Sequence, residues 1–254
     1  MRKAIALLMM LAMVSLPLMA AGEDEEREDK RLENCGKILN EILNEPEHGM
    51  PQFVLDRSYC VIMLPGTKRG NGFIFTGGLG GTFGRGAMTC RTGDHYNGTW
   101  GAPTMVALEG ITWGLAAGGA STDILITIMN ENGANSILTS KAKLGGNVTA
   151  TAGPVGRDAA AESDAMLKSE LLTFARAKGL FAGAELQGST LRADGPANEK
   201  IYGKKINPKD VVLHGADAPP PSAKELLDAL TQRSPTRKDA PKGGDSPPKA
   251  GAQD

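Results

Sequence analysis

Residues 152–157, AGPVGR, place glycines, a proline and an arginine directly after the alternating run NVTATA. A loop of this kind holds a nucleotide phosphate when its backbone N–H groups are free and a lysine and a hydroxyl follow. Here Pro154 removes one donor, Arg157 stands where the lysine is needed, and Asp158 adds a negative charge. The four residues from 153 to 156 instead suit a type I turn, with proline second and glycine fourth. We therefore expect a simple turn, in which Arg157 remains a candidate contact for a lipid phosphate.

Other spacings that would support catalysis or metal binding are not found in the sequence. The run GGLGGTFGRG departs from the dinucleotide fingerprint, because Phe83 stands where the third glycine is required. The three histidines, His48, His95 and His214, lie far apart without ligand spacing, which argues against a metal site and against a histidine-based triad. Because no nucleophile–base pair is visible, we expect a protein that is not an enzyme and needs no cofactor or metal.

The first residues indicate the compartment. Two basic residues precede an apolar run at 4–16, which is broken at Pro17 and followed by small residues at 20–22. This layout is typical of a secretory signal peptide over 1–22; a retained membrane anchor is the alternative, since the run approaches the length of a span. No cysteine follows the run, so lipid attachment is not expected there. We expect a periplasmic or secreted protein.

Composition limits the partners. The formal net charge of −1 becomes −3 once the two basic residues of the leader are removed, so no global basic field favours nucleic acid. Glycine is frequent, at 33 of 254 residues, and aromatic residues make up only 4%. The glycines are spread through apolar alternations, which indicates a folded glycine-rich domain and not a linker.

Three cysteines follow the leader. An oxidising compartment favours one disulfide and one unpaired thiol. Cys35 shares the helical phase of Leu32 and Leu39, so we interpret it as a small buried hydrophobic residue. Cys60 and Cys90 both lie in strand-like segments, and we predict that these two form the disulfide.

The spacing of apolar residues separates helical from strand segments. Residues 23–30, EDEEREDK, are expected to be a solvated leader, and residues 31–45 to form an amphipathic helix. From Tyr59 onward the period is that of closely spaced strands, which favours antiparallel pairing because parallel crossovers need a dozen or more residues. A short helix is expected at 131–143.

Later segments are less regular. Residues 158–170 favour a helix by propensity, whereas 171–191 are also compatible with two strands that meet near Lys178. A helix is expected at 222–232, and the polar residues that follow are expected to be disordered. The expected organisation is a signal peptide (1–22), an acidic leader with a helix (23–54), a β-rich domain (55–206), a helical extension (207–232) and a disordered tail (233–254).

Five motifs carry a resemblance to a known family. They are GFIFTGGLGGTFGRGAMTCR, WGAPTMVALEGITWGLAAGGASTDILITIMN, KLGGNVTATAGPVGR, ARAKGLFAGAELQGSTLRAD and ANEKIYG. In this order, over Leu55 to Lys205, the chain resembles SYLF domains, which are also called lipid-binding or actin-regulating domains. The resemblance implies a single β-rich domain, which agrees with the strand pattern. Together with the helices expected at 31–45 and 222–232, the expected fold class is α+β: a glycine-rich, mainly antiparallel domain with an N-terminal amphipathic helix and a C-terminal helix. The resemblance also favours a strand for 171–178.

The resemblance also bears on partners. Eukaryotic members resembling this chain bind phosphoinositide membranes, and some bundle actin; an exported copy resembles the bacterial branch, for which actin is not an expected partner. Members often carry Tyr-Ser-Arg-Ser-Arg where this chain has FARAK at 174–178, so the hydroxyls are lost and both basic residues are kept. The helix at 31–45 matches the lipid-binding helix of some members in position. Its polar face is net negative, which favours packing on the domain.

The resulting hypothesis is an exported, non-enzymatic domain that binds an anionic lipid or a membrane surface. The alternative is an envelope protein–protein interaction or scaffold module without lipid binding. Each candidate lipid contact is a cation in a loop or at a strand end that is able to bind phosphate. The candidates are Lys68, Arg69, Arg85, Arg157, Arg176 and Lys178.

Overall fold

The computed structural model describes residues 25–45, 49–71, 79–113, 120–155, 169–177 and 180–238. The expected signal peptide, the candidates Arg157 and Lys178, and most of the expected tail lie outside these ranges. The side chains of a few strand residues, including Arg69, are also outside the description.

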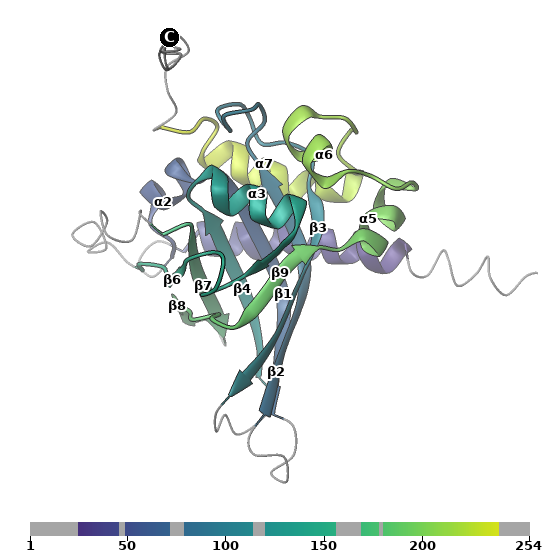
Figure 1. Ribbon diagram of the computed structural model, residues 1–254. Helices are drawn as coiled ribbons and strands as arrows, with labels where there is room; N and C mark the ends of the chain where they lie inside the picture. Colours follow the sequence, from purple (N-terminus) through teal and green to yellow (C-terminus); the bar gives the residue numbers. More distant parts are fainter. Residues whose placement is uncertain are drawn as a thin grey trace, which may run out of the picture.

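The described part of the chain is built on a nine-stranded sheet in the order β5-β9-β3-β2-β1-β4-β7-β6, with β8 pairing on β7. All strand pairs are antiparallel except β6–β7. The four longest strands lie side by side, and their ends project away from the helices (Figure 1). The strands are β1 (Cys60–Asn71), β2 (Leu79–Cys90), β3 (Thr104–Trp113), β4 (Ala120–Ile128), β5 (Lys141–Lys143), β6 (Ala150–Ala152), β7 (Leu171–Ala177), β8 (Leu180–Gly183) and β9 (Ser189–Ala193).

Helices cover both faces of this sheet. The first, which we call the N-terminal helix, spans residues 25–43. The others are α2 (Gln52–Arg57), α3 (Glu131–Thr139), α5 (Gly195–Tyr202), α6 (Pro208–His214) and α7 (Lys224–Arg233), with a short 3-10 turn, η3 (Pro221–Ala223), before α7. Figure 1 shows α3 and the N-terminal helix on opposite sides of the sheet. The expected α+β fold with a mainly antiparallel sheet and a helix near each end is confirmed.

Alternation along β1 divides the core into two layers. Val61 and Met63 pack under the N-terminal helix and α7, together with Leu39. Cys60, Ile62 and the other residues of opposite phase pack under α3 and α6. Successive strand residues point to opposite faces, so one apolar run supplies both layers. The N-terminal helix therefore packs its apolar stripe on the domain.

Two glycines allow close approaches in the fold, one in the N-terminal helix and one in strand β1. A β-carbon on Gly36 would lie 2.6 Å from the backbone nitrogen of Leu226, so only glycine permits α7 to cross the helix this closely. The register of β1 against β2 shifts between Met63 and Lys68, where Gly66 has a positive φ of 56°. This bulge re-aims the strand, as bulges do, and the Gly66 amide donates to Asp123 Oδ1 at 2.9 Å.

Two boundaries differ from the sequence-based expectation. The N-terminal helix begins at residue 25, within the segment expected to be a solvated leader, and Glu28 is only 1% exposed. Glu28 tolerates burial because it forms ion pairs with Arg27 and Arg31. The tail expected to be disordered from 233 is ordered through Lys238, and Ser234 is completely buried. Composition alone did not reveal this, because polar contacts hold the segment in place.

Secondary structure elsewhere refines the expectations. The helix expected at 131–143 spans only Glu131–Thr139, and β5 follows directly. Asn130 caps the start of this helix, because its side chain accepts a hydrogen bond from the Gly133 amide. The segment 171–177 is a strand, as the family resemblance favours. The helix α5 lies within the segment expected to be the β-rich domain.

Candidate functional site

Cationic side chains gather along the exposed side of the N-terminal helix. An open cavity of about 610 Å³ lies there, lined by Arg27, Lys30, Arg31, Glu33, Asn34, Lys37, Pro65 and Glu225. Most of these residues follow the three- and four-residue spacing that brings side chains to one face of a helix. Four cations and two carboxylates line the cavity. Three of the cations also form ion pairs along the helix, Lys30 with Glu26 and both Arg27 and Arg31 with Glu28.

The charges in this cavity crowd one another. Burial lowers the pKa of Arg31, and the nearby guanidinium groups of Arg85 and Arg27 lower it further, while Asp194 opposes the shift. Arg31 forms an ion pair with the buried Glu28. A ligand that carries negative charge would relieve this repulsion, which is the usual chemistry of an arginine-rich phosphate site.

The sheet extends this cationic surface. Lys68 on β1 lies opposite Phe83 on β2, and Arg85 lies two residues further along β2, so all three share one face of the sheet. That face is the one covered by the N-terminal helix, because Met63 and Ala87, also opposite each other, pack beneath it. Lys68 is exposed and forms no ion pair within the described ranges.

The neighbours of Lys68 on this face have different environments. Arg85 is half exposed, with its Nε 3.7 Å from Asp194 Oδ2. Phe83 is 62% exposed and lies opposite Lys68. We call the cationic members of this surface the basic face: Arg27, Lys30, Arg31, Lys37, Lys68 and Arg85.

Of the candidates named from the sequence, Lys68 and Arg85 belong to this surface, and Arg176 does not. An Arg176 amino group lies 2.8 Å from Glu41 Oε2 and 3.3 Å from Asp123 Oδ2. Arg176 thus joins β7 to β4 and to the N-terminal helix, and its charge is balanced by two carboxylates. The side chain of Arg69, together with Arg157 and Lys178, lies outside the described residues.

Sequence reasoning missed the helix cations. The sequence pattern places Arg27 and Lys30 in the expected solvated leader, and Arg31 and Lys37 on a helix face whose net charge is negative. The available signal was the helical spacing of positions 27, 30, 31, 34 and 37, which continues the period of the helix back into the acidic run. A helix that includes residue 25 places these cations on one face of the helix.

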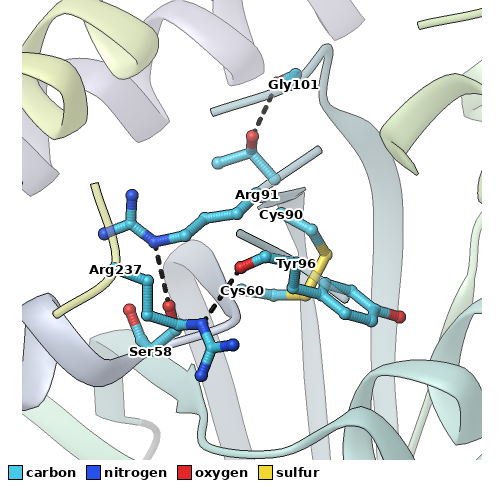
Figure 2. The surroundings of a disulfide bond; sticks show 8 residues. Ser58, Cys60, Cys90, Arg91, Tyr96, Gly101 and Arg237 are labelled. Atoms are coloured by element: carbon cyan, nitrogen blue, oxygen red, sulfur yellow. Dashed lines mark hydrogen bonds between the residues drawn. A yellow bond between two sulfur atoms is a disulfide. The ribbon is translucent and has the colours of Figure 1, made fainter. Parts of the chain in front are cut away.

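Figure 2 shows the end of the sheet where the expected disulfide lies. Cys60 and Cys90 lie directly opposite each other in the β1–β2 register, and their sulfur atoms are bonded at 2.02 Å. Cys35 is a free, buried thiol that donates to the Met63 carbonyl at 3.4 Å. Burial raises the pKa of this thiol to about 12, so it is unreactive at neutral pH.

Two kinds of feature are absent from the described ranges. No group of three or more histidine, cysteine, aspartate or glutamate residues in them is arranged to hold a metal ion. No helix in them combines the length and the apolar character needed to cross a membrane.

Comparison with known proteins identifies the family. Residues 109–233 match the family model described as Ysc84, Las17-binding protein actin regulator. The chain is 34% identical over 188 residues to Protein YSC84 of Saccharomyces cerevisiae. This alignment covers 73% of this chain and 38% of that protein. Over 211 residues the chain is 28% identical to the human SH3 domain-containing YSC84-like protein 1, covering 78% of this chain and 58% of that protein.

The chain therefore contains a domain of the Ysc84/SYLF family, and the resemblance drawn from the sequence motifs is confirmed. The chain spans about two fifths of the length of the yeast relatives it matches. No solved structure matches it.

Proposed function

We propose that this protein is a non-enzymatic module that binds anionic phospholipid surfaces through its basic face. The observation that carries the proposal is the cavity on the N-terminal helix, which gathers Arg27, Lys30, Arg31 and Lys37, with Lys68 and Arg85 on the sheet face beneath the same helix. The formal net charge of the whole chain is −1, so attraction to an anionic surface must come from a local cluster of this kind.

The physical chemistry of the face fits a membrane surface. Each lysine or arginine near an anionic bilayer contributes about 1 kcal/mol, and salt screens the attraction. Phe83 places an exposed apolar ring beside Lys68, and a pairing of apolar and cationic groups favours contact with the headgroup region. Bound phosphate would also offset the repulsion between Arg31 and Arg85.

We further propose that residues 1–22 direct export, so that the protein meets its membrane in the periplasm or outside the cell. The relatives' printed names concern Las17 binding and actin regulation in eukaryotes; an exported chain would not meet actin. N-terminal sequencing of the secreted protein tests export, and a mature chain that begins near residues 21–23 is expected.

Vesicle flotation tests the lipid proposal. We compare the unaltered mature protein with a triple variant, Lys30→Ala, Lys37→Ala and Lys68→Ala, at low and at physiological salt. Loss of three contacts of about 1 kcal/mol each should weaken partitioning onto anionic vesicles by about 100-fold. The unaltered protein should bind neutral vesicles weakly and should lose affinity as salt increases.

A matched control removes the same charge elsewhere. The control is a triple variant, Lys204→Ala, Lys205→Ala and Lys209→Ala. These lysines lie near the start of α6 and do not line the cavity. This variant should keep its binding to within a few-fold. Equal loss in both variants, or no binding by the unaltered protein at low salt, would overturn the lipid proposal and leave protein–protein interaction as the function.

A further inference from the structure

The five residues after α7 lie against the body of the domain. We call residues 234–238, SPTRK, the C-terminal strap. Proline at 235 disfavours a helical conformation for the residue before it, and Ser234 indeed has φ −150° and ψ 77°, so the chain leaves the helix here. The strap then passes α2 and the loop at 92–97, and it makes its contacts through single side chains and carbonyls, not through a sheet.

Ser234 is the first anchor. Its hydroxyl accepts from Arg91 Nη2 at 2.7 Å, and its carbonyl accepts from Trp100 Nε1 at 2.9 Å. Arg91 itself is completely buried, and its Nε donates to the Ser58 carbonyl at 3.2 Å. The strap thus supplies acceptors to donors that would otherwise be left unpaired in the interior, which is costly.

Arg237 is the second anchor and is only 7% exposed. Its guanidinium carbon lies 3.9 Å from the centroid of the Tyr59 ring, within range of a cation–π interaction. Its Nε donates to the Tyr96 carbonyl at 3.0 Å (Figure 2). Its Nη2 donates to the His95 carbonyl at 3.1 Å. The planar fork of arginine matches two adjacent acceptors in a way that lysine does not.

Lys238 closes the strap. Its amide donates to the Asp56 carbonyl at 3.0 Å, and its ammonium group pairs with the Asp56 carboxylate. The strap therefore contacts α2 at one end of its site and the loop at 92–97 at the other.

The domain itself shapes this site. Tyr59 directly precedes Cys60 and Arg91 directly follows Cys90, so the disulfide holds the aromatic wall and the buried cation at adjoining strand ends. Tyr96 has φ 51°, the positive value that a non-glycine residue adopts only under constraint, in the turn that presents the two carbonyls to Arg237. Its ring packs against Tyr59 with centroids 5.4 Å apart.

The strap is held by directional contacts. Arg91 is buried, and the nearby Arg237 guanidinium repels it, whereas the Asp56 carboxylate, which pairs with Lys238, attracts it. Arg91 Nη1 is buried without a hydrogen-bond partner. The strap is bound through a few hydrogen bonds, an ion pair and a cation–π contact, so any segment that offers the same groups at the same spacing would satisfy the site.

We propose that the strap site is a binding site for an extended protein segment in which an arginine stands three residues after a serine. The chain's own strap fills the site in cis, and a partner's segment of the same chemistry takes its place when the strap leaves. The observed occupant defines the required chemistry: a hydroxyl and a carbonyl for Arg91 and Trp100, and a guanidinium for Tyr59 and the two loop carbonyls.

Fluorescence anisotropy with a labelled peptide of residues 233–240 tests the proposal. The peptide should bind saturably to a chain that ends at Arg233, and at least about tenfold more weakly to a chain that ends at Lys238 and keeps its strap. A peptide with Arg237→Ala should bind about tenfold more weakly than the native peptide, since it loses the cation–π contact and two hydrogen bonds. Arg237→Lys should not restore binding.

The intact chain with Arg237→Ala provides a second measurement, because its own strap then competes poorly. This variant should bind the native peptide at least about tenfold more tightly than the unaltered chain does. The proposal would be overturned if the chains with and without the strap bound the peptide equally, or if the native and alanine peptides bound equally. If the chain without the strap does not fold, the Arg237→Ala chain decides: no gain in its affinity for the native peptide would also overturn the proposal.

Discussion

The guanidinium of Arg91 lies over the ring of Trp100, 4.2 Å from its centroid, and both side chains donate a hydrogen bond to Ser234. The end of β2, the loop that precedes β3 and the residue after α7 therefore meet at one point. Ser234 follows the last residue matched by the family model, so this contact ties a segment beyond the matched region to the domain. The part of the domain that the structure describes consequently extends to Lys238.

We predict that a chain ending at Arg233 is less stable than one ending at Lys238. The shorter chain loses several hydrogen bonds and a cation–π contact, together worth about 2–3 kcal/mol. In a domain of this size that corresponds to a decrease of about 5–10 °C in melting temperature. The chain ending at Lys238 should melt with the full-length protein, because residues 239–254 contain few apolar side chains. Equal melting temperatures for all three chains would contradict the contacts made by the strap.

We predict that the disulfide contributes substantially to stability. Cys60 and Cys90 are separated by 30 residues, and closing a loop of that length stabilises a fold by about 3–4 kcal/mol in the chain-entropy model. Replacing both cysteines with alanine should lower the free energy of unfolding in urea by about this amount. Non-reducing peptide mapping supplies the control: a bridge that includes Cys35, or three free thiols, would show that the pairing is different.

We predict an alkaline loss of stability that depends on Cys35. Burial raises the pKa of its thiol from 9.0 to about 12, so the folded state holds the proton more tightly than the unfolded state. This contribution is complete below pH 9 and is lost as the pH rises from 9 toward 12. At pH 10 the loss is about 1 kcal/mol.

A Cys35→Ala variant isolates this effect from the titration of other groups. Its unfolding free energy should be lower than that of the unaltered protein at pH 7, since a buried side chain is truncated. The difference in unfolding free energy between the two proteins should narrow by about 1 kcal/mol between pH 8 and pH 10 in urea titrations. A constant difference over that range would mean that the thiol titrates normally.

We predict that Arg176 supports the fold and not the binding of lipid. It is paired with Glu41 and Asp123 and is partly exposed, so Arg176→Ala should lower stability by about 1 kcal/mol. Binding to anionic vesicles should stay within about threefold of the unaltered protein. A loss of vesicle binding comparable to that of the triple lysine variant would instead place Arg176 in the binding surface.

Several properties follow from short stretches of sequence. The alternation in CVIMLP, the helical stripe of Leu32, Cys35 and Leu39, and the turn-rich spacing between strands each depend on neighbours within a few residues. They indicated the antiparallel α+β fold, and the ordered motifs indicated the family. The pairing of Cys60 with Cys90 was accessible for a similar reason, because both cysteines lie in strand-like segments that follow one another.

Only the tertiary structure decided which cations act together and which are already paired. Lys68 and Arg85 share a face because a bulge shifts the register between β1 and β2, and Arg176 is neutralised by a carboxylate on a helix far away in the sequence. The strap is ordered through contacts such as that of Arg91 with Ser234, 143 residues apart. The composition of a segment indicates how much apolar surface it is able to bury. It does not indicate whether the segment forms hydrogen bonds to distant residues, because those bonds depend on where the partners lie in the folded protein.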